Sequence, residues 1–328
     1  MGDIGIYYGE ELLQYAFPNG HKFNKERVKS FWEAVQILGL LERREVRVLK
    51  PALASTDILE LFHTKEHIEF VKKMSEVGSG LLDYGDTPAF KGVFEAASYV
   101  VGSVVDAVDR VMLGEVEHCF IPVAGLHHAR RDRAAGFCVF NDIGVAIVYA
   151  KKKYGLNRIL YVDIDAHHGD GVFYEFYDDP MVWIADIHED GRYLYPGTGF
   201  REETGSPHAP NTKLNIPLPP GATDREFIEA FKEVEEFARR AEPQLIFFQC
   251  GADGLEGDPI THLRYTYRAH RHAAERLHEV AHILCKGRII ATGGGGYNEN
   301  NTAAAWNAVL MGFLGPRWDM PTSPGYML

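Results

Sequence analysis

Short apolar runs alternate with longer amphipathic stretches along most of this 328-residue chain. A short run of β-branched and aromatic residues is typical of a buried strand, and apolar residues spaced three and four apart are typical of a helix with one buried face. Their alternation predicts an α/β protein in which helices cover both faces of a mostly parallel sheet. The predicted strands are Ile4–Tyr8, His118–Val123, Arg158–Ile164, Val182–Ile187, Gln244–Cys250 and Arg288–Thr292.

The remaining periodic segments are predicted to be helices. They are Lys25–Leu41, Lys65–Val77, Phe90–Leu113, Asp142–Tyr154, Asp224–Ala241, Thr266–Lys286 and Thr302–Leu314. Two segments rich in Gly, Pro, Ser and Asn, Gly78–Pro88 and Glu203–Thr223, are predicted to be long loops. Hydrophobic residues make up 46% of the chain, which is enough for a large core, and no repeat or low-complexity linker divides it. We therefore expect a single domain over residues 1–328.

Composition and charge argue against several classes of protein. The formal net charge of -12 is unsuited to direct nucleic-acid binding, and no apolar run approaches the roughly 20 residues of a membrane span. The N-terminus lacks a basic region followed by an apolar core, so no signal peptide is expected. Four cysteines in apolar surroundings form no CxxC pair, which is typical of buried free thiols in a reducing compartment. These features predict a cytoplasmic protein.

Four of the predicted strands run into clusters of polar residues or glycines. Ligands of open α/β sheets bind outside the carboxyl ends of the strands, and parallel strands bring those ends to one edge. We therefore expect the four clusters to form one site. The clusters are His127-His128, Asp163-Ile-Asp165-Ala-His167-His168-Gly-Asp170, Gly251-Ala-Asp253 and Gly293-Gly-Gly-Gly-Tyr297.

The cluster that begins at Asp163 holds the most charge. Charged groups at a buried strand end are costly unless they are paired, protonated or bound to a metal ion. Asp165 and His167 are typical ligands of a divalent cation, and Asp253 offers a third. The alternatives are a structural salt bridge and a helix N-cap. An EF-hand is excluded, because the sixth residue counted from Asp163 is His168 rather than glycine.

The adjacent histidines His127 and His128 would point to opposite faces of a regular strand. An irregular backbone, which the preceding Gly125 favours, would let both rings face one cavity. Asp163 and Asp170 are then free to bond these rings, which would fix their tautomers and raise their basicity. The alternative is one buried structural histidine and one exposed histidine.

Two further motifs suggest other functions. Gly293–Gly296 is a weak match to a phosphate loop, because no Gly-Lys-Ser/Thr follows it. It fits better a close approach of the backbone to a ligand, with Tyr297 delivered into the cavity. His278-Glu-Val-Ala-His282 matches the H-E-x-x-H motif of zinc proteases. For this helix, which also carries His270 and His272, we favour a solvated face with the histidines toward water.

Taken together and in order, these motifs resemble the zinc-dependent histone deacetylases. The resemblance covers Tyr8 to Gly315 and points to the class I-like group that includes the prokaryotic acetoin-utilisation deacetylases. It implies the arginase-deacetylase fold, with a central, mostly parallel eight-stranded sheet. It also implies a metal-dependent amidohydrolase, in which metal-bound water removes acetyl or related acyl groups from the Nε of lysine in peptides or proteins.

The resemblance assigns roles to individual residues. The implied zinc ligands are Asp165, His167 and Asp253. The implied catalytic residues are His127, His128, Asp163, Asp170 and Tyr297, with His128 as general base and Tyr297 polarising the carbonyl. The implied substrate-binding residues are Asp86, Gly136, Phe137, Tyr195, Ile260 and Gly295, and the implied acetate channel contains Arg27. Zn²⁺ is our first choice of metal, although Fe²⁺ or Co²⁺ also suits two carboxylates and one imidazole.

This chain departs from the family pattern at two positions. Tyr195 stands where the second wall of the acyl-lysine tunnel is usually Phe. Asp186, in the segment Asp186-Ile187-His188 that resembles part of a structural K⁺ site, stands where relatives often have Ser. The charge or occupancy of that K⁺ site is therefore open.

Two other hydrolases remain as alternatives. The first is a deacetylase of acetylpolyamines or other small amides, and the second is a ureohydrolase of the same fold with two manganese ions. Ile260 occupies the position of the glutamate that polyamine-specific relatives use to pair with an ammonium, and Asp86 can accept backbone N–H bonds from a peptide. We therefore expect an acetylated protein or peptide substrate. The oligomeric state is left open.

Overall fold

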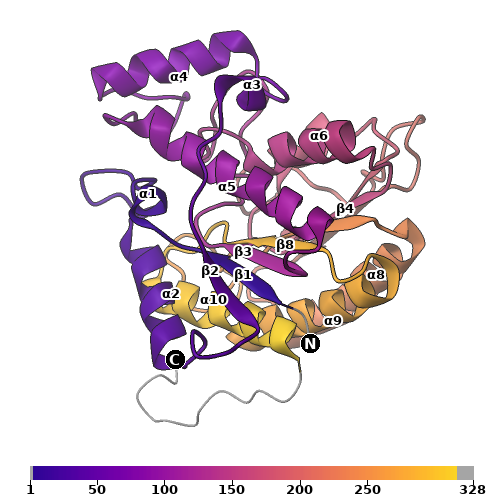
Figure 1. The fold of residues 1–328 in the computed structure, drawn as a ribbon. Coiled ribbons are helices and arrows are strands. Elements are labelled where there is room, and N and C mark those ends of the chain that lie inside the picture. The colour runs from indigo at the N-terminus through magenta and orange to yellow at the C-terminus, as the bar shows by residue number, and fades with distance from the viewer. Residues whose placement is uncertain (1–2, 316–328) are drawn as a thin grey trace.

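A computed structural model, which describes residues 3–315, places eight parallel strands in one sheet in the order β2-β1-β3-β8-β7-β4-β5-β6. Helices cover both faces of this sheet (Figure 1). The expected α/β architecture is confirmed, and the strands are all parallel rather than mostly so. The strands are β1 Ile4–Tyr7, β2 Val46–Leu49, β3 His118–Ile121, β4 Ile159–Asp163, β5 Val182–Glu189, β6 Lys213–Leu218, β7 Leu245–Gln249 and β8 Ile289–Thr292.

The helices follow the amphipathic stretches of the sequence closely. They are α1 Glu10–Leu13, α2 Glu26–Ile37, α3 Thr56–Leu59, α4 Lys65–Val77, α5 Val93–Leu113, α6 Asp142–Tyr154, α7 Asp170–Glu175, α8 Asp224–Ala241, α9 Tyr267–Leu284 and α10 Glu299–Leu314. Local signals explain several of their ends. Thr64 caps the first turn of α4, Gly78 ends it in the left-handed conformation, and Thr223 and Glu226 form a capping box on α8.

The sheet separates two hydrophobic layers. Along β7, Leu245 and Phe247 belong to the layer formed with α5 and α6, whereas Ile246 and Phe248 belong to the layer formed with α2, α8, α9 and α10. Figure 1 shows these two groups of helices on opposite sides of the strands. Burial on both faces explains why the central strands are continuous apolar runs in the sequence.

Some elements differ from the prediction. The segment Glu203–Thr223 is not a continuous loop, because β6 occupies Lys213–Leu218. Its sequence Lys-Leu-Asn-Ile-Pro-Leu interrupts the apolar pattern, and Pro217 is tolerated because β6 is an edge strand. The other edge strand, β2, was also missed, as were the short helices α1, α3 and α7. The loop Gly78–Pro88 and the four buried free cysteines, Cys119, Cys138, Cys250 and Cys285, are confirmed.

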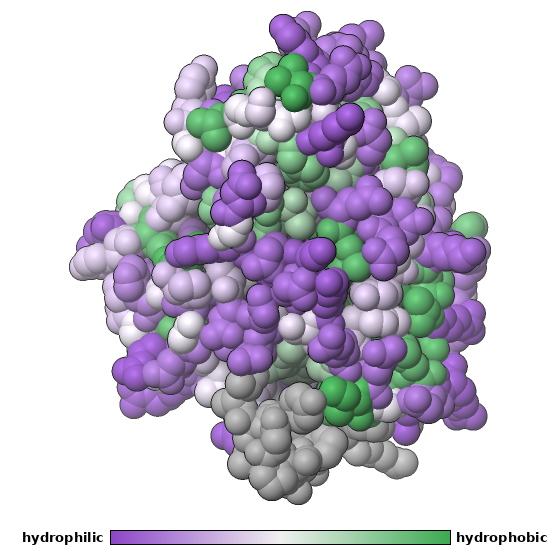
Figure 2. Space-filling view, turned by 90° about the vertical axis from the view of Figure 1, so that its left-hand side faces the viewer, coloured by the Kyte–Doolittle hydropathy of each residue, from purple (hydrophilic) through white to green (hydrophobic). Residues whose placement is uncertain are grey.

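The four strands that end in polar or glycine clusters are neighbours at the centre of the sheet. They lie in the order β3, β8, β7 and β4. Their carboxyl ends therefore meet along one edge, as expected. Among residues 3–315 no helix is both long and apolar enough to cross a membrane. On the side of the molecule where β1 runs into α1, hydrophobic residues are scattered among hydrophilic ones (Figure 2).

Candidate active site

Three buried side chains from two strand ends converge on one point. The Nδ1 atom of His167 lies 3.1 Å from Asp165 Oδ1 and 2.9 Å from Asp253 Oδ2. All three side chains are buried, and their donor atoms lie within 4.8 Å of one another. Asp165 and His167 follow β4, and Asp253 follows β7, so the structure brings the predicted metal ligands together. Two carboxylates around one imidazole nitrogen suit a divalent cation, whose charge would offset theirs.

Backbone and amide donors hold the two carboxylates in place. Asp165 Oδ2 accepts hydrogen bonds of 2.8 Å from both the Gln249 side-chain amide and the Gly295 N–H, and Asp253 Oδ1 accepts one of 2.8 Å from the Ala166 N–H. A Cβ at Gly295 would lie 2.2 Å from Asp253 Oδ2. Glycine is therefore required there, because the backbone passes directly against the carboxylates. Such partners fix the orientation of ligating groups.

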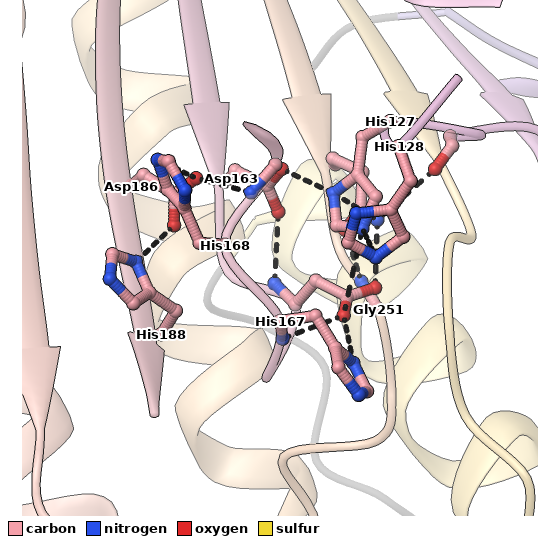
Figure 3. A network of polar contacts seen from close by, with 12 residues as sticks. His127, His128, Asp163, His167, His168, Asp186, His188 and Gly251 are labelled. Carbon is pink, nitrogen blue, oxygen red and sulfur yellow. Dashed lines mark hydrogen bonds and ion pairs between the residues drawn. The ribbon is translucent and has the colours of Figure 1, made fainter. Parts of the chain in front are cut away.

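His127 and His128 lie side by side with their Nε2 atoms toward each other, and Asp163 holds the ring of His127 (Figure 3). His127 Nδ1 lies 2.7 Å from Asp163 Oδ2, and His128 Nδ1 lies 2.7 Å from Asp170 Oδ1. The Nε2 atoms of the two rings are 3.0 Å apart. The backbone between β3 and α6 is irregular here, and Gly125 has a φ of 98°. The irregular backbone therefore lets both rings turn toward each other, as expected.

The two rings have opposite electrostatic character. Burial lowers the pKa of His127, but the carboxylates of Asp163 and Asp165 outweigh this and raise it to about 10. Burial and the neighbouring His127 lower the pKa of His128 to about 4. One ring therefore carries the positive charge while the other is neutral, because two adjacent imidazolium ions repel each other. His128 is the ring whose Nε2 is able to accept a proton.

Tyr297 is held in place by its backbone and by ring packing. Its N–H donates to Asp258 Oδ2 over 2.8 Å, and its ring packs edge-on against Phe137 with centroids 5.8 Å apart. Burial and the carboxylates of Asp253 and Asp165 raise the pKa of the phenol well above its ordinary value. The hydroxyl therefore stays protonated and is a hydrogen-bond donor at neutral pH.

Two aromatic side chains border the approach to the histidines. The ring centroid of Tyr195 lies 5.0 Å from that of His128, and Phe137 packs against Tyr297. Phe137 follows Gly136, whose φ is 53° and whose Cβ, if present, would lie 2.6 Å from the His128 ring. Gly136 thus lets the chain pass over His128 and present Phe137. Tyr195 is 50% exposed, so its side of the approach to the histidines is both polar and accessible.

The loop that carries Asp86 is tied to Phe137. Asp83 accepts hydrogen bonds from the backbone N–H groups of residues 85, 86 and 87, and the Thr87 hydroxyl in turn accepts the Phe137 N–H over 3.0 Å. Asp86 itself is exposed, although partial shielding of its carboxyl from water and the nearby Asp83 raise its pKa. Ile260 lies on another loop, where its N–H donates to Asp258 over 3.0 Å. Asp258, on the same loop as Ile260, also accepts the backbone N–H of Tyr297.

Arg27 is buried behind the glycine run. Its Nε and Nη2 donate to the backbone oxygens of Gly296 and Gly294, the second over 2.6 Å, and its guanidinium lies 4.0 Å from the Phe23 ring centroid. Its Nη1 has no hydrogen-bond partner within residues 3–315. A buried cationic donor without a partner is costly, so this position is suited to an anion.

The segment Asp186-Ile187-His188 forms a second polar network beside the first (Figure 3). Asp186 accepts a hydrogen bond from the Gly169 N–H over 2.9 Å, and its other oxygen lies 2.6 Å from His188 Nδ1. His188 Nε2 lies 2.8 Å from the Gly199 oxygen. Asp186 is therefore engaged by protein groups, and the structural K⁺ stays a prediction.

The expectation for the histidine-rich helix α9 is wrong in part. His282 is exposed, but His270 is fully buried and its Nε2 lies 2.8 Å from the Gly251 oxygen. His278 is only partly exposed, because its ring lies against His118 from β3. Neither His278 nor His282 belongs to the group formed by Asp165, His167 and Asp253. The protease motif thus lies outside this site.

Several residues of the site were not found from the sequence. Arg130 donates to Asp170 over 2.8 Å, so it shares the carboxylate that holds His128. Gln249 bonds Asp165, and Asp258 bonds the backbone of Tyr297. The polar Gln249 at the end of the apolar run Leu-Ile-Phe-Phe was the one available signal. Arg130 and Asp258 act through contacts between segments distant in the sequence.

Comparison with known proteins agrees with this geometry. The sequence model of the protein family described as "Histone deacetylase domain" matches residues 21–313 of this chain. The acetoin utilization protein AcuC of Bacillus subtilis is 41% identical over 309 residues, covering 91% of this chain and 78% of that protein. AcuC of Staphylococcus xylosus is 33% identical, covering 95% and 82%. The crystal structure of the HDA15 HD domain superposes with a TM-score of 0.87 at 25% identity, covering 96% of this chain and 89% of that one.

The domain match includes strands β2 to β8 and the strand ends that form the site. The domain match includes the histidine pair, the Asp165 cluster and the glycine run before Tyr297. The parallel eight-stranded sheet and the structural neighbour agree on the arginase-deacetylase fold. The chain therefore belongs to the histone deacetylase family of hydrolases and is similar over most of its length to the acetoin-utilisation members of that family.

Proposed function

We propose that this protein removes acetyl or related acyl groups from the Nε of lysine in peptides or proteins. The observation that carries the proposal is the pair His127 and His128, each bonded to its own buried aspartate beside the Asp165, His167 and Asp253 group. Hydrolysis of an unactivated amide requires a general base for water and stabilisation of a developing oxyanion. His128 is our candidate for the first task and Tyr297 for the second.

The metal would be held by Asp165, His167 and Asp253, with Zn²⁺ as the first choice and Fe²⁺ or Co²⁺ as alternatives. When bound, such an ion polarises a carbonyl and lowers the pKa of water. Among the described residues the donors at this site form one group of three, which favours one metal ion over the two of a ureohydrolase.

The protein residues would act in sequence on the amide. His128 Nε2 accepts the proton of the attacking water, because its ring is neutral and Asp170 holds its Nδ1. His127 remains charged and stabilises the negative charge that develops. The Tyr297 hydroxyl donates to the oxyanion, and His128 then gives its proton to the leaving amine. Arg27, with its unpaired Nη1, would bind the acetate that is released.

The rim of the site favours a peptide substrate. Asp86 is exposed on a loop that Asp83 and Thr87 fix against Phe137, so its carboxylate is able to accept backbone N–H bonds. Ile260, in contrast, offers no charge to pair with the distant ammonium of a polyamine. Tyr195 and Phe137 would form the walls around the lysine methylenes. A single catalytic domain over residues 1–328, a cytoplasmic location and the absence of direct nucleic-acid binding stay predictions.

A substrate panel tests this proposal. Purified protein with its metal content measured is assayed on acetyl-lysine peptides, acetylspermidine and acetylputrescine. We expect a higher kcat/KM for the peptides, and Asp86→Ala should reduce peptide turnover more than turnover of a minimal acetyl-lysine analogue. A clear preference for acetylpolyamines that Asp86→Ala leaves unchanged would replace the peptide by a small amide as the substrate.

A further inference from the structure

A second group of histidines lies at the amino ends of the strands, whereas the catalytic residues lie at the carboxyl ends. His118, the first residue of β3, meets His278 and His282 of α9. Their ring nitrogens lie within 4.8 Å of one another, and His118 Nε2 is 2.9 Å from His278 Nδ1. The ring centroid of His282 lies 4.3 Å from that of His278 and 5.5 Å from that of His118. Three imidazoles therefore share one small volume.

This group is separate from the catalytic residues. His118 begins β3, whereas His127 follows the carboxyl end of the same strand. His270 of α9 bonds Gly251 near the catalytic edge, but His278 lies two turns further, about 12 Å along the helix axis at 1.5 Å per residue. The two groups therefore occupy opposite ends of the strand and of the helix.

The rings are suited to metal binding because each offers one ring nitrogen at a shared point, and the surroundings of His118 and His278 favour the neutral form of these two. Burial and the neighbouring His278 lower the pKa of His118 well below its ordinary value, and burial and His282 lower that of His278 to about 4. A neutral imidazole has a free lone pair, which is the form that binds metal ions. His278 and His282, at positions i and i+4, lie on the same face of the helix.

The polar atoms of the group are incompletely satisfied by the protein. His118 is fully buried, and its Nδ1 has no hydrogen-bond partner within the described residues. The buried Oε2 atom of Glu117 likewise has no hydrogen-bond partner there, although it lies 3.8 Å from His282 Nε2. Buried polar atoms of native proteins normally make hydrogen bonds, so two such atoms without one beside the rings call for an explanation. A bound cation would offset the charge of the Glu117 carboxylate, and it would bind His118 through Nε2, the nitrogen that faces His278.

The group is also accessible from outside. A surface pocket is lined by His278, Glu279, His282 and Ile283. His282 is exposed, His278 is partly exposed and His118 is buried. An ion could therefore enter beside α9 and reach the buried ring of β3, leaving a coordination position open to water.

We propose that His118, His278 and His282 form a second metal site, which binds one Zn²⁺ ion through three imidazoles. Three nitrogen ligands and an open position are a common set for zinc, and the same donors also suit Cu²⁺ and Ni²⁺. The ion would replace the proton shared between His118 and His278 and would tie the amino end of β3 to α9. Because the ion binds only the folded arrangement, it would raise the stability of the protein.

Metal stoichiometry tests the proposal independently of the catalytic site. The protein is incubated with excess ZnCl₂ at neutral pH, passed over a gel-filtration column and assayed for zinc. We expect two equivalents in the unaltered protein and one in His278→Ala/His282→Ala. Asp165→Ala/Asp253→Ala should also retain one, and the combination of all four substitutions should retain none. His272→Ala is the matched control, because His272 lies on the same helix outside the group, and it should keep both equivalents.

Cobalt provides a spectroscopic check that does not depend on activity. Co²⁺ bound at the three imidazoles should give visible absorption that persists in Asp165→Ala/Asp253→Ala and disappears when His278→Ala/His282→Ala is added. His278→Gln alone, a milder change if the double variant folds poorly, should weaken binding of the second equivalent at least tenfold. A single zinc equivalent in the unaltered protein, or a second one that survives loss of both helix histidines, would overturn the proposal.

Discussion

The Nε2 atoms of His127 and His128 lie 3.0 Å apart, while the Nδ1 atoms of the two rings bond different aspartates. At this distance the pair is able to hold one proton between the rings but not a positive charge on each. Asp163 accepts the Tyr161 hydroxyl and the Asp165 N–H as well, but His127 is its ion-pair partner, whereas Asp170 divides its charge between His128 and Arg130. The positive charge therefore resides on His127, and His128 is left as the base.

His128→Ala should reduce kcat/KM by on the order of 10²-fold or more, since a positioned base contributes about 10²–10⁴-fold. Metal content should be unchanged, because His128 is not in the Asp165, His167 and Asp253 group. In the unaltered protein, kcat/KM plotted against pH should decline on its acidic limb only at pH values below the ordinary pKa of histidine, because the pKa of His128 is lowered to about 4. Steady-state kinetics from pH 4 to 8 measure both effects.

Arg130→Ala gives a finer test of the same relationship. Without the Arg130 guanidinium, His128 is the remaining ion-pair partner of Asp170. The basicity of His128 should rise, and the acidic limb should move to higher pH while the metal content stays constant. An acidic limb that moves to lower pH, or normal turnover by His128→Ala, would contradict the assignment of His128 as base.

Tyr297→Phe should retain its metal and bind a hydroxamate, a bidentate metal chelator, nearly as well as the unaltered protein. Its turnover should fall by on the order of 10²–10³, the typical cost of one lost oxyanion donor. The ring would keep its packing against Phe137, because only the hydroxyl is removed. Single-turnover rates on an acetyl-lysine peptide, together with hydroxamate titrations, provide the measurement. Nearly normal turnover would remove Tyr297 from the mechanism.

Asp165→Ala and Asp253→Ala should each lose the catalytic metal and activity together. Both carboxylates lie close to His167 Nδ1, and neither has a substitute among the donor groups of the described residues. Elemental analysis should show one metal equivalent fewer than in the unaltered protein, and peptide turnover should be lost with that equivalent. His208→Ala, at an exposed position, is the control and should preserve both. An Asp253→Ala protein that keeps its catalytic metal would remove Asp253 from the ligand set.

The sequence predicted the centre of this fold better than its edges. Strands β4, β7 and β8 are buried on both faces, so each is a continuous apolar run, and their ends carry the polar clusters. The edge strand β6 is broken by Asn215 and Pro217, which disguised it as a loop. At the site, residues at strand ends were found. Residues that act through contacts with a distant segment, such as Arg130 with Asp170, were not found. The spacing of residues along the sequence does not show which distant segments come into contact.

The last prediction concerns stability rather than catalysis and depends on His63. This buried ring accepts the Asn141 N–H at Nε2 over 2.9 Å, close to the start of α6. Burial and the neighbouring His67 lower the pKa of His63 to about 3. An unfolded histidine, with a pKa of about 6.5, binds a proton more readily. The neutral ring therefore makes its full contribution to the free energy of unfolding above pH 6.5, and this contribution is lost as the pH falls toward 3.

His63→Gln should reduce this acid sensitivity, because a side-chain amide oxygen can accept the Asn141 N–H without titrating. Between pH 6 and 4 the free energy of unfolding should decline less steeply in the variant, by up to about 1.4 kcal/mol per pH unit for one proton. Urea unfolding at several pH values measures the slopes, and His208→Gln, at an exposed position, is the control. Equal slopes in His63→Gln and the unaltered protein would mean that His63 is protonated in the folded state, and that the hydrogen bond from Asn141 does not hold it neutral.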